Sequence, residues 1–100
     1  MPKGNLRHGH RKKGYFTQTY NSWRAMKQRC NNKRHRWYKN YGGKGIAYDP
    51  LWETFLNFLL DMGPAPPGHD LDRRDPKKDY NEDNCRWMPK AQNRGRRRVT

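Results

Sequence analysis

Residues 69–93 constrain the fold most, because they combine two strand-like runs, a polar loop between them and a short helical run. Four polar residues of this stretch follow one another at separations of 1, 11 and 9: Asp72, Arg73, Asn84 and Asn93. A strand–loop–strand–helix unit of this size can bring all four together. Their carboxylate and carboxamide oxygens are ligands that hard divalent cations prefer.

These residues belong to motifs that resemble the ββα-metal motif of the HNH nuclease superfamily, in the form found in small phage and homing-type endonucleases. The motifs are Asp72-Arg73-Arg74-Asp75, Asn84-Cys85-Arg86-Trp87 and Gln92-Asn93. The upstream run Tyr41-Gly42-Gly43-Lys44-Gly45-Ile46, with Trp52, Phe55 and Asp61-Met62-Gly63, also resembles short phage and bacterial proteins labelled HNH. The resemblance covers about residues 17–98.

The resemblance implies a metal-dependent endonuclease or nickase that hydrolyses a phosphodiester bond in double-stranded DNA. Asp72 and Asn93 align with the family's ligands for one Mg²⁺ or Mn²⁺ ion. Asn84 aligns with an asparagine that orients the catalytic histidine, and the histidine position itself holds Arg73. Structural roles remain open for Asp72 as an ion-pair partner, for Asn84 as a turn residue and for Asn93 as a helix-terminal residue.

Arginine is a poor general base because its side chain stays protonated. We therefore expect Arg73 to clamp the phosphate and to stabilise charge in the transition state. The base is then a hydroxide on the metal, or His69, which lies four residues upstream on the same strand face. The trailing residue Asp75 is expected to organise the loop by accepting backbone amides.

The charge of the chain indicates a nucleic-acid partner. The net charge is +14, with 13 Lys/Arg and no acid in residues 1–48, and all nine acids in residues 49–83. Basic segments of this kind release counterions from phosphates and give sequence-independent affinity. The expected contacts are Arg24, Lys27, Lys33, Arg34, Arg36, Lys44, Arg74, Arg94, Arg96, Arg97 and Arg98. The alternative function is a non-catalytic basic DNA-binding or RNA-binding protein that retains an HNH-like fold.

The predicted fold class is α+β, a small single domain with an N-terminal helix, a core helix and a C-terminal ββα-metal module. We expect three parts: a basic flexible arm (1–16), a DNA-binding half with helices and a short strand (17–63), and a ββα-metal nuclease module (64–98).

Periodicity predicts a helix over 17–31, which Thr17 or Thr19 can cap, with one apolar stripe made by Tyr20, Trp23, Met26 and Cys30. A short strand is predicted at 45–48. The clearest helix is predicted at 50–62, because Asp49-Pro50 is a typical helix start and Gly63-Pro64 a typical stop. A last short helix is predicted to begin near Pro89.

The sequence contains no apolar run long enough to span a membrane and no signal-peptide pattern. We therefore expect a cytoplasmic protein, in a bacterial host or encoded by a phage. Cys30 and Cys85 lack the paired spacing of a structural zinc site, so zinc is not expected, although a mixed Cys/His site stays open as an alternative. One module per chain implies nicking by a monomer, and a double-strand cut requires a homodimer.

Overall fold

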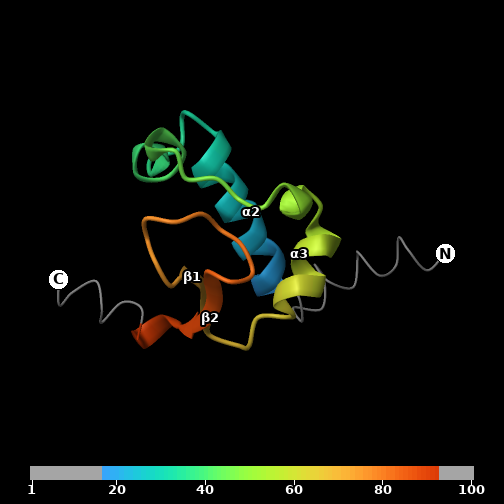
Figure 1. The fold of residues 1–100 in the computed structure, drawn as a ribbon. Helices are drawn as coiled ribbons and strands as arrows, with labels where there is room; N and C mark the ends of the chain where they lie inside the picture. The colour runs from blue at the N-terminus through green and yellow to red at the C-terminus, as the bar shows by residue number, and fades with distance from the viewer. Residues whose placement is uncertain (1–16, 93–100) are drawn as a thin grey trace.

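The computed structural model describes residues 17–92 of the 100-residue chain. It is a small α+β domain of helices and one two-stranded antiparallel sheet, which confirms the α+β class that the sequence predicted (Figure 1). The elements in order are α2 (Thr17–Asn31), the 3-10 turns η1 (Tyr38–Asn40), η2 (Gly42–Lys44) and η3 (Pro50–Glu53), α3 (Phe55–Met62), β1 (His69–Arg73) and β2 (Cys85–Pro89). The predicted arm at 1–16 lies outside the described residues.

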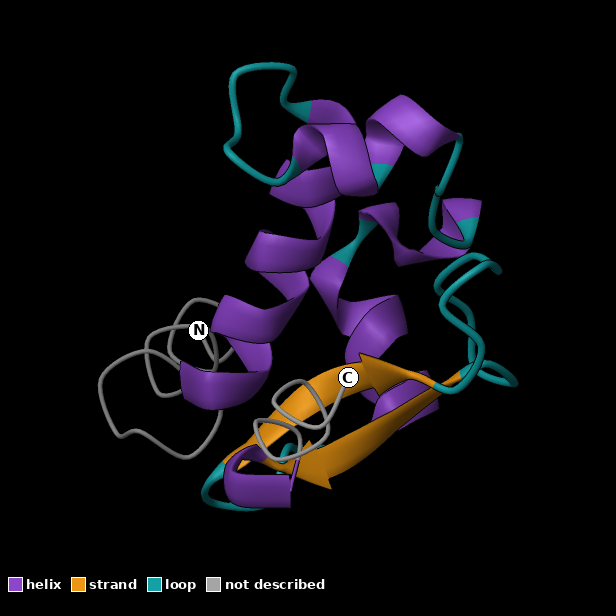
Figure 2. Ribbon diagram, turned by 90° about the vertical axis from the view of Figure 1, so that its left-hand side faces the viewer, coloured by secondary structure: helices purple, strands orange, loops and turns teal. Residues whose placement is uncertain are grey.

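The two strands form a hairpin with one face toward the helices. Leu71 pairs with Trp87 and Arg73 with Cys85, so these residues share one face of the sheet. Leu71, Trp87 and Cys85 pack into the hydrophobic core beneath α2 and α3, as Figure 2 shows for the ribbons. Asp72 pairs with Arg86 on the opposite face. The chain is helical again at residues 90–92, one residue later than predicted.

The core is small and aromatic, and both halves of the chain contribute to it. Met26, Trp52 and Phe58 are fully buried, and Cys85 of β2 belongs to the same cluster. Phe58 packs edge-on against Trp52, with ring centroids 4.9 Å apart, and against Trp87 at 6.1 Å. The two predicted halves therefore form one domain. No helix within residues 17–92 is long and apolar enough to cross a membrane.

The helix predicted at 50–62 is interrupted. Asp49 caps its start as predicted, accepting from the Leu51 amide at 3.0 Å, but Thr54 is extended (φ −98°, ψ 128°) and separates η3 from α3. The reason is the burial of Trp52, whose Nε1 donates to Asp61 at 2.7 Å. In a continuous helix, residues nine apart lie on opposite faces, about 13 Å apart along the axis. The break brings them together.

Two further sequence predictions differ from the structure. The strand predicted at 45–48 is reduced to one bridge, between Tyr48 and Tyr80, because the hairpin loop offers it only a short partner. Tyr80 donates its amide to Ala47 and accepts from Asp49, both at 2.9 Å. Thr19 is not a cap: it is buried within α2, and its Oγ1 accepts from the Ala65 amide at 2.7 Å, which fixes the linker before β1.

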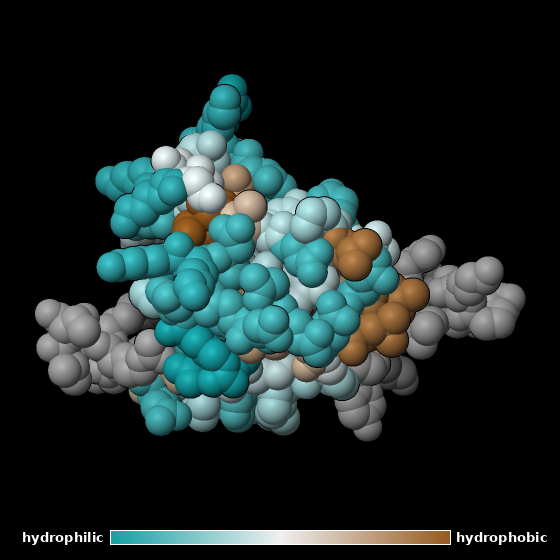
Figure 3. Space-filling model, viewed as in Figure 1, coloured by the Kyte–Doolittle hydropathy of each residue, from teal (hydrophilic) through white to brown (hydrophobic). Residues whose placement is uncertain are grey.

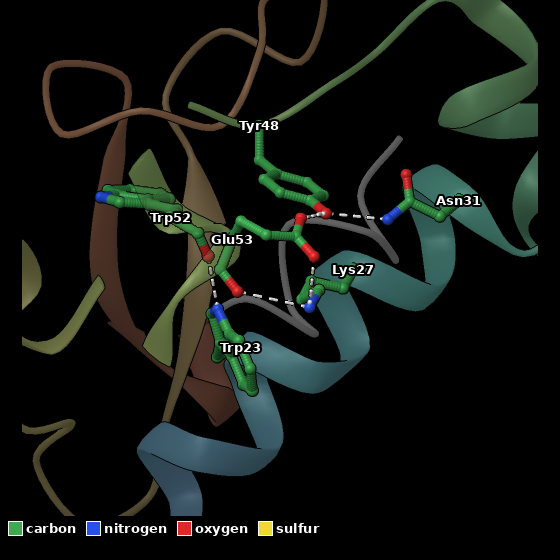
Figure 4. A network of polar contacts seen from close by, with 6 residues as sticks. All are labelled: Trp23, Lys27, Asn31, Tyr48, Trp52 and Glu53. Carbon is green, nitrogen blue, oxygen red and sulfur yellow. Dashed lines mark hydrogen bonds and ion pairs between the residues drawn. The ribbon is translucent and has the colours of Figure 1, made fainter. Parts of the chain in front are cut away.

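Polar contacts join α2 to η3 (Figure 4). Glu53 accepts from Lys27 at 3.0 Å and from the Tyr48 hydroxyl at 2.5 Å. Asn31, at the end of α2, donates to the same hydroxyl at 2.8 Å. Trp23 donates its indole N–H to the Trp52 carbonyl at 2.7 Å. Lys27 is thereby held against the protein, although the sequence suggested it as a nucleic-acid contact.

Candidate cation and phosphate site

Asp72 and Arg86 form the centre of the candidate site, on the hairpin face opposite to Leu71 and Trp87. They are direct cross-strand partners, and Arg86 Nε lies 3.0 Å from Asp72 Oδ2. The Asp72 side chain is 11% exposed and that of Arg86 is 34% exposed. The site therefore places a carboxylate, which binds cations, beside a guanidinium, which binds phosphate.

Asp72 fits a hard divalent cation by its chemistry. Mg²⁺ commonly takes one or two carboxylates, keeps several waters and completes its shell with substrate phosphates. Asp70 lies on the same strand face about 7 Å further along and accepts from Gln18. Within residues 17–92 no three His, Cys, Asp or Glu side chains gather into a metal site. The other expected ligand, Asn93, lies outside the described residues.

Arg73 is on the other face, and its guanidinium is engaged by the protein itself. Nη1 donates to the carbonyls of Pro76 and Lys78, each at 2.7 Å. Its Cζ lies 5.1 Å from the ring centroid of Tyr41 and 5.0 Å from that of Tyr80. These contacts join the hairpin loop to the turn that contains Tyr41. They explain an arginine here without any contact to phosphate.

Asn84 organises the hairpin loop from within. It is buried, its Oδ1 accepts from the Asp75 amide at 2.9 Å, and its Nδ2 donates to the carbonyls of Asp75 and Asp79. Asp75 in turn accepts from the Lys77 amide at 2.9 Å, as expected from the sequence. None of these hydrogen bonds of the Asn84 side chain goes to Arg73, so the geometry matches a role for Asn84 as a loop residue.

His69 shares the strand face of Arg73, as expected, but the structure does not bring the two together. They occupy opposite ends of β1, which places them about 13 Å apart. His69 Nδ1 lies 3.0 Å from the Pro67 carbonyl. His69 also lies on the opposite face of the sheet from the Asp72–Arg86 ion pair, so it is not next to either of these side chains.

The expected nucleic-acid contacts fall into four groups. Arg24 of α2 and Arg74, just after β1, are exposed, and four more of the expected contacts are exposed in the turn after α2: Lys33, Arg34, Arg36 and Lys44. Lys27 is held by Glu53. The remaining four lie outside the described residues: Arg94, Arg96, Arg97 and Arg98.

Buried titratable groups near the hairpin remain neutral at pH 7. Burial raises the pKa of Cys30 and of Cys85 to about 11, and that of Tyr80 to about 12. Both cysteines are free thiols. The Tyr80 hydroxyl accepts from Arg29 at 3.4 Å. These side chains support the core and the loop, and thiolate or phenolate chemistry is disfavoured there.

Sequence reasoning missed two features of this region. It did not find the role of Tyr41 and Tyr80 around Arg73, because nothing in a sequence links residues so far apart. It did not single out Arg86 either, although a role as an ion-pair partner was an open interpretation for Asp72. Comparisons of the chain with protein-family models, with curated proteins and with solved structures found no match.

Proposed function

We propose that this protein is a metal-dependent DNA endonuclease that nicks one strand, with its site on the Asp72–Arg86 face of the hairpin. The observation that carries the proposal is the 3.0 Å pair between these two side chains, on the hairpin face opposite to Leu71 and Trp87. Phosphodiester hydrolysis needs a ligand for a cation and a donor for phosphate oxygens, and these residues supply one of each.

Asp72 would hold a Mg²⁺ or Mn²⁺ ion together with Asn93. When bound, the ion stabilises charge on the phosphate and on the leaving oxygen. Arg86 is placed to leave Asp72 for a phosphate oxygen when the backbone of DNA arrives, because it is one-third exposed. Basic residues elsewhere on the chain supply the affinity for the duplex.

A second candidate is a non-catalytic nucleic-acid-binding protein. The observation that favours it is the engagement of Arg73 by two loop carbonyls, since the family position for a general base then holds a structural residue. His69 is too far along β1 to replace it. Both candidates share the same fold and the same basic surface, and they differ in whether Asp72 is needed for a reaction.

The test is nicking of supercoiled plasmid with Mg²⁺ or Mn²⁺ against a chelator. Asp72→Asn and Asn93→Ala are compared with Asp83→Asn, a matched change at an exposed carboxylate of the hairpin loop. We expect metal-dependent nicking that falls by at least about 100-fold in the first two variants, since even indirect partners of a metal ligand cost roughly 10- to 100-fold. Nicking by none of the proteins, with salt-sensitive DNA binding intact, would instead establish the second candidate.

A further inference from the structure

The basic turn, residues 33–44, projects from the C-terminal end of α2 and carries five exposed cations. They are Lys33, Arg34, Arg36, Lys39 and Lys44. There is no acidic residue anywhere in residues 33–48, and in the described part of the chain no carboxylate forms an ion pair with any of the five. This region lies at the upper left of Figure 3, where hydrophilic side chains surround a small apolar patch. The turn is thus a surface for a polyanion.

Trp37 stands in the middle of this basic turn with 48% of its surface exposed. The other three tryptophans are built into the fold through their indole N–H groups, which donate to Trp52 O, Asp61 and Met62 O. Within residues 17–92, Trp37 alone has no such bond. The core does not use it, and exposing a large indole on so small a domain has no structural benefit.

Arg36 lies against Trp37, with its Cζ 5.4 Å from the ring centroid. The pair offers an aromatic surface and a positive charge side by side. Bases of single-stranded nucleic acids stack on such surfaces while nearby cations contact the flanking phosphates. In a duplex the base faces are already stacked, so an exposed indole gains little there.

The turn is held in shape by its own contacts, which lowers the entropy cost of binding. Trp37 donates its amide to His35 Nδ1 at 3.1 Å, and Arg34 donates its amide to Asn32 Oδ1 at 2.9 Å. Gly42 fixes the far end, since a Cβ there would lie 2.2 Å from the Cys30 carbonyl oxygen. The backbone of Gly42 therefore packs directly against the C-terminal end of α2.

We infer that the basic turn is a binding site for unpaired nucleotides, in which Trp37 stacks on a base and the surrounding lysines and arginines contact its phosphates. This site goes beyond the proposed nuclease, because it needs neither a cation nor Asp72. It would hold single-stranded nucleic acid, or a frayed or displaced strand next to a duplex.

The experiment uses the full chain with Asp72→Asn in a chelator, so that no cleavage can occur and failure of the nuclease proposal has no effect on it. A labelled oligothymidylate of about ten nucleotides and a duplex of the same length are titrated by anisotropy. Trp37→Ala is compared with Leu60→Ala, which removes an exposed apolar side chain on α3.

We expect Trp37→Ala to weaken binding of the single strand by about tenfold and that of the duplex by less than about twofold, with Leu60→Ala neutral for both. Intrinsic tryptophan fluorescence should be quenched by the single strand only when Trp37 is present. If Trp37→Ala lost the same factor in affinity for the single strand and for the duplex, the inference would be overturned. It would also be overturned if polyglutamate quenched the fluorescence as strongly as the oligonucleotide, because the partner would then be an acidic protein.

Discussion

At the scale of single residues, two arginines of the hairpin have opposite situations. Arg73, in the position that sequence motifs connect with catalysis, is held by two loop carbonyls and lies over two tyrosine rings. Arg86 forms an ion pair with Asp72, and its side chain is one-third exposed. A side chain that must leave its partner to bind phosphate has to be partly exposed and weakly held, as Arg86 is. We therefore assign the phosphate contact to Arg86.

Replacing Arg86 by glutamine should raise the affinity of the DNA-free protein for Mn²⁺ by roughly fivefold, because a positive charge next to the Asp72 carboxylate opposes a second cation. Titration of Mn²⁺ followed by the paramagnetic resonance of the free ion measures this. Lys78→Gln in the exposed loop is the matched control for loss of charge. Unchanged or weaker Mn²⁺ binding by Arg86→Gln would exclude Asp72 as the cation ligand next to it.

At the scale of elements, the turn between α2 and η3 depends on a close backbone contact. A Cβ on Gly42 would lie 2.2 Å from the Cys30 carbonyl oxygen and 2.4 Å from Tyr38 Cε1, whereas one on Gly43 meets nothing nearer than 3.1 Å. Since the first neighbour is backbone, it cannot move aside without shifting the end of α2.

Gly42→Ala should lower the free energy of unfolding by about 2 kcal/mol or more, and Gly43→Ala by clearly less. Urea unfolding followed by circular dichroism measures both variants against the wild type. Equal stabilities for the two variants would mean that the contact between Gly42 and Cys30 is not tight.

The junction of α2 and η3 should also respond to pH. Hydrogen bonds from Tyr48 and from Lys27 hold the pKa of the Glu53 carboxyl below its ordinary value of 4.5. A pKa that is lower in the folded state stabilises the fold above the unfolded pKa, and this contribution is lost as the pH falls through the folded pKa.

As the pH is lowered below about 4.5, we expect the urea concentration at the midpoint of unfolding to decrease in the wild type. In Glu53→Gln the decrease should be smaller, because the variant lacks the carboxyl that becomes protonated. Glu82→Gln, in the exposed hairpin loop, is the control for loss of one carboxylate. If Glu53→Gln and Glu82→Gln follow the wild-type pH profile equally, the contacts of Figure 4 do not stabilise the folded state.

Much of the element order could be predicted from the sequence, because it depends on local signals. The apolar stripe that includes Met26 and Cys30 predicted the first helix, and two strand-like runs separated by a polar loop predicted the hairpin. The break at Thr54 could not be predicted, because its cause is a bond between Trp52 and Asp61 that exists only once the core forms. The contacts of Arg73 are likewise tertiary.

At the scale of the whole molecule, charge and structure divide the chain in the same way. The described acids and the hairpin lie in residues 49–83 and beyond, while the basic turn and α2 precede them without a single carboxylate. In the proposed function, the hairpin would combine a cation ligand with a phosphate ligand, and the first half of the chain would supply positive charge for a nucleic-acid backbone. The proposed chemistry depends on Asp72 and not on Arg73.

The most direct measurement is the single-turnover rate of nicking in Mn²⁺ for Asp72→Asn and Arg73→Lys, at a temperature where circular dichroism shows both variants folded. We predict a loss of about 100-fold or more for Asp72→Asn and a rate within about threefold of the wild type for Arg73→Lys, which keeps the charge. The opposite order, with Arg73→Lys inactive and Asp72→Asn active, would contradict the proposed site.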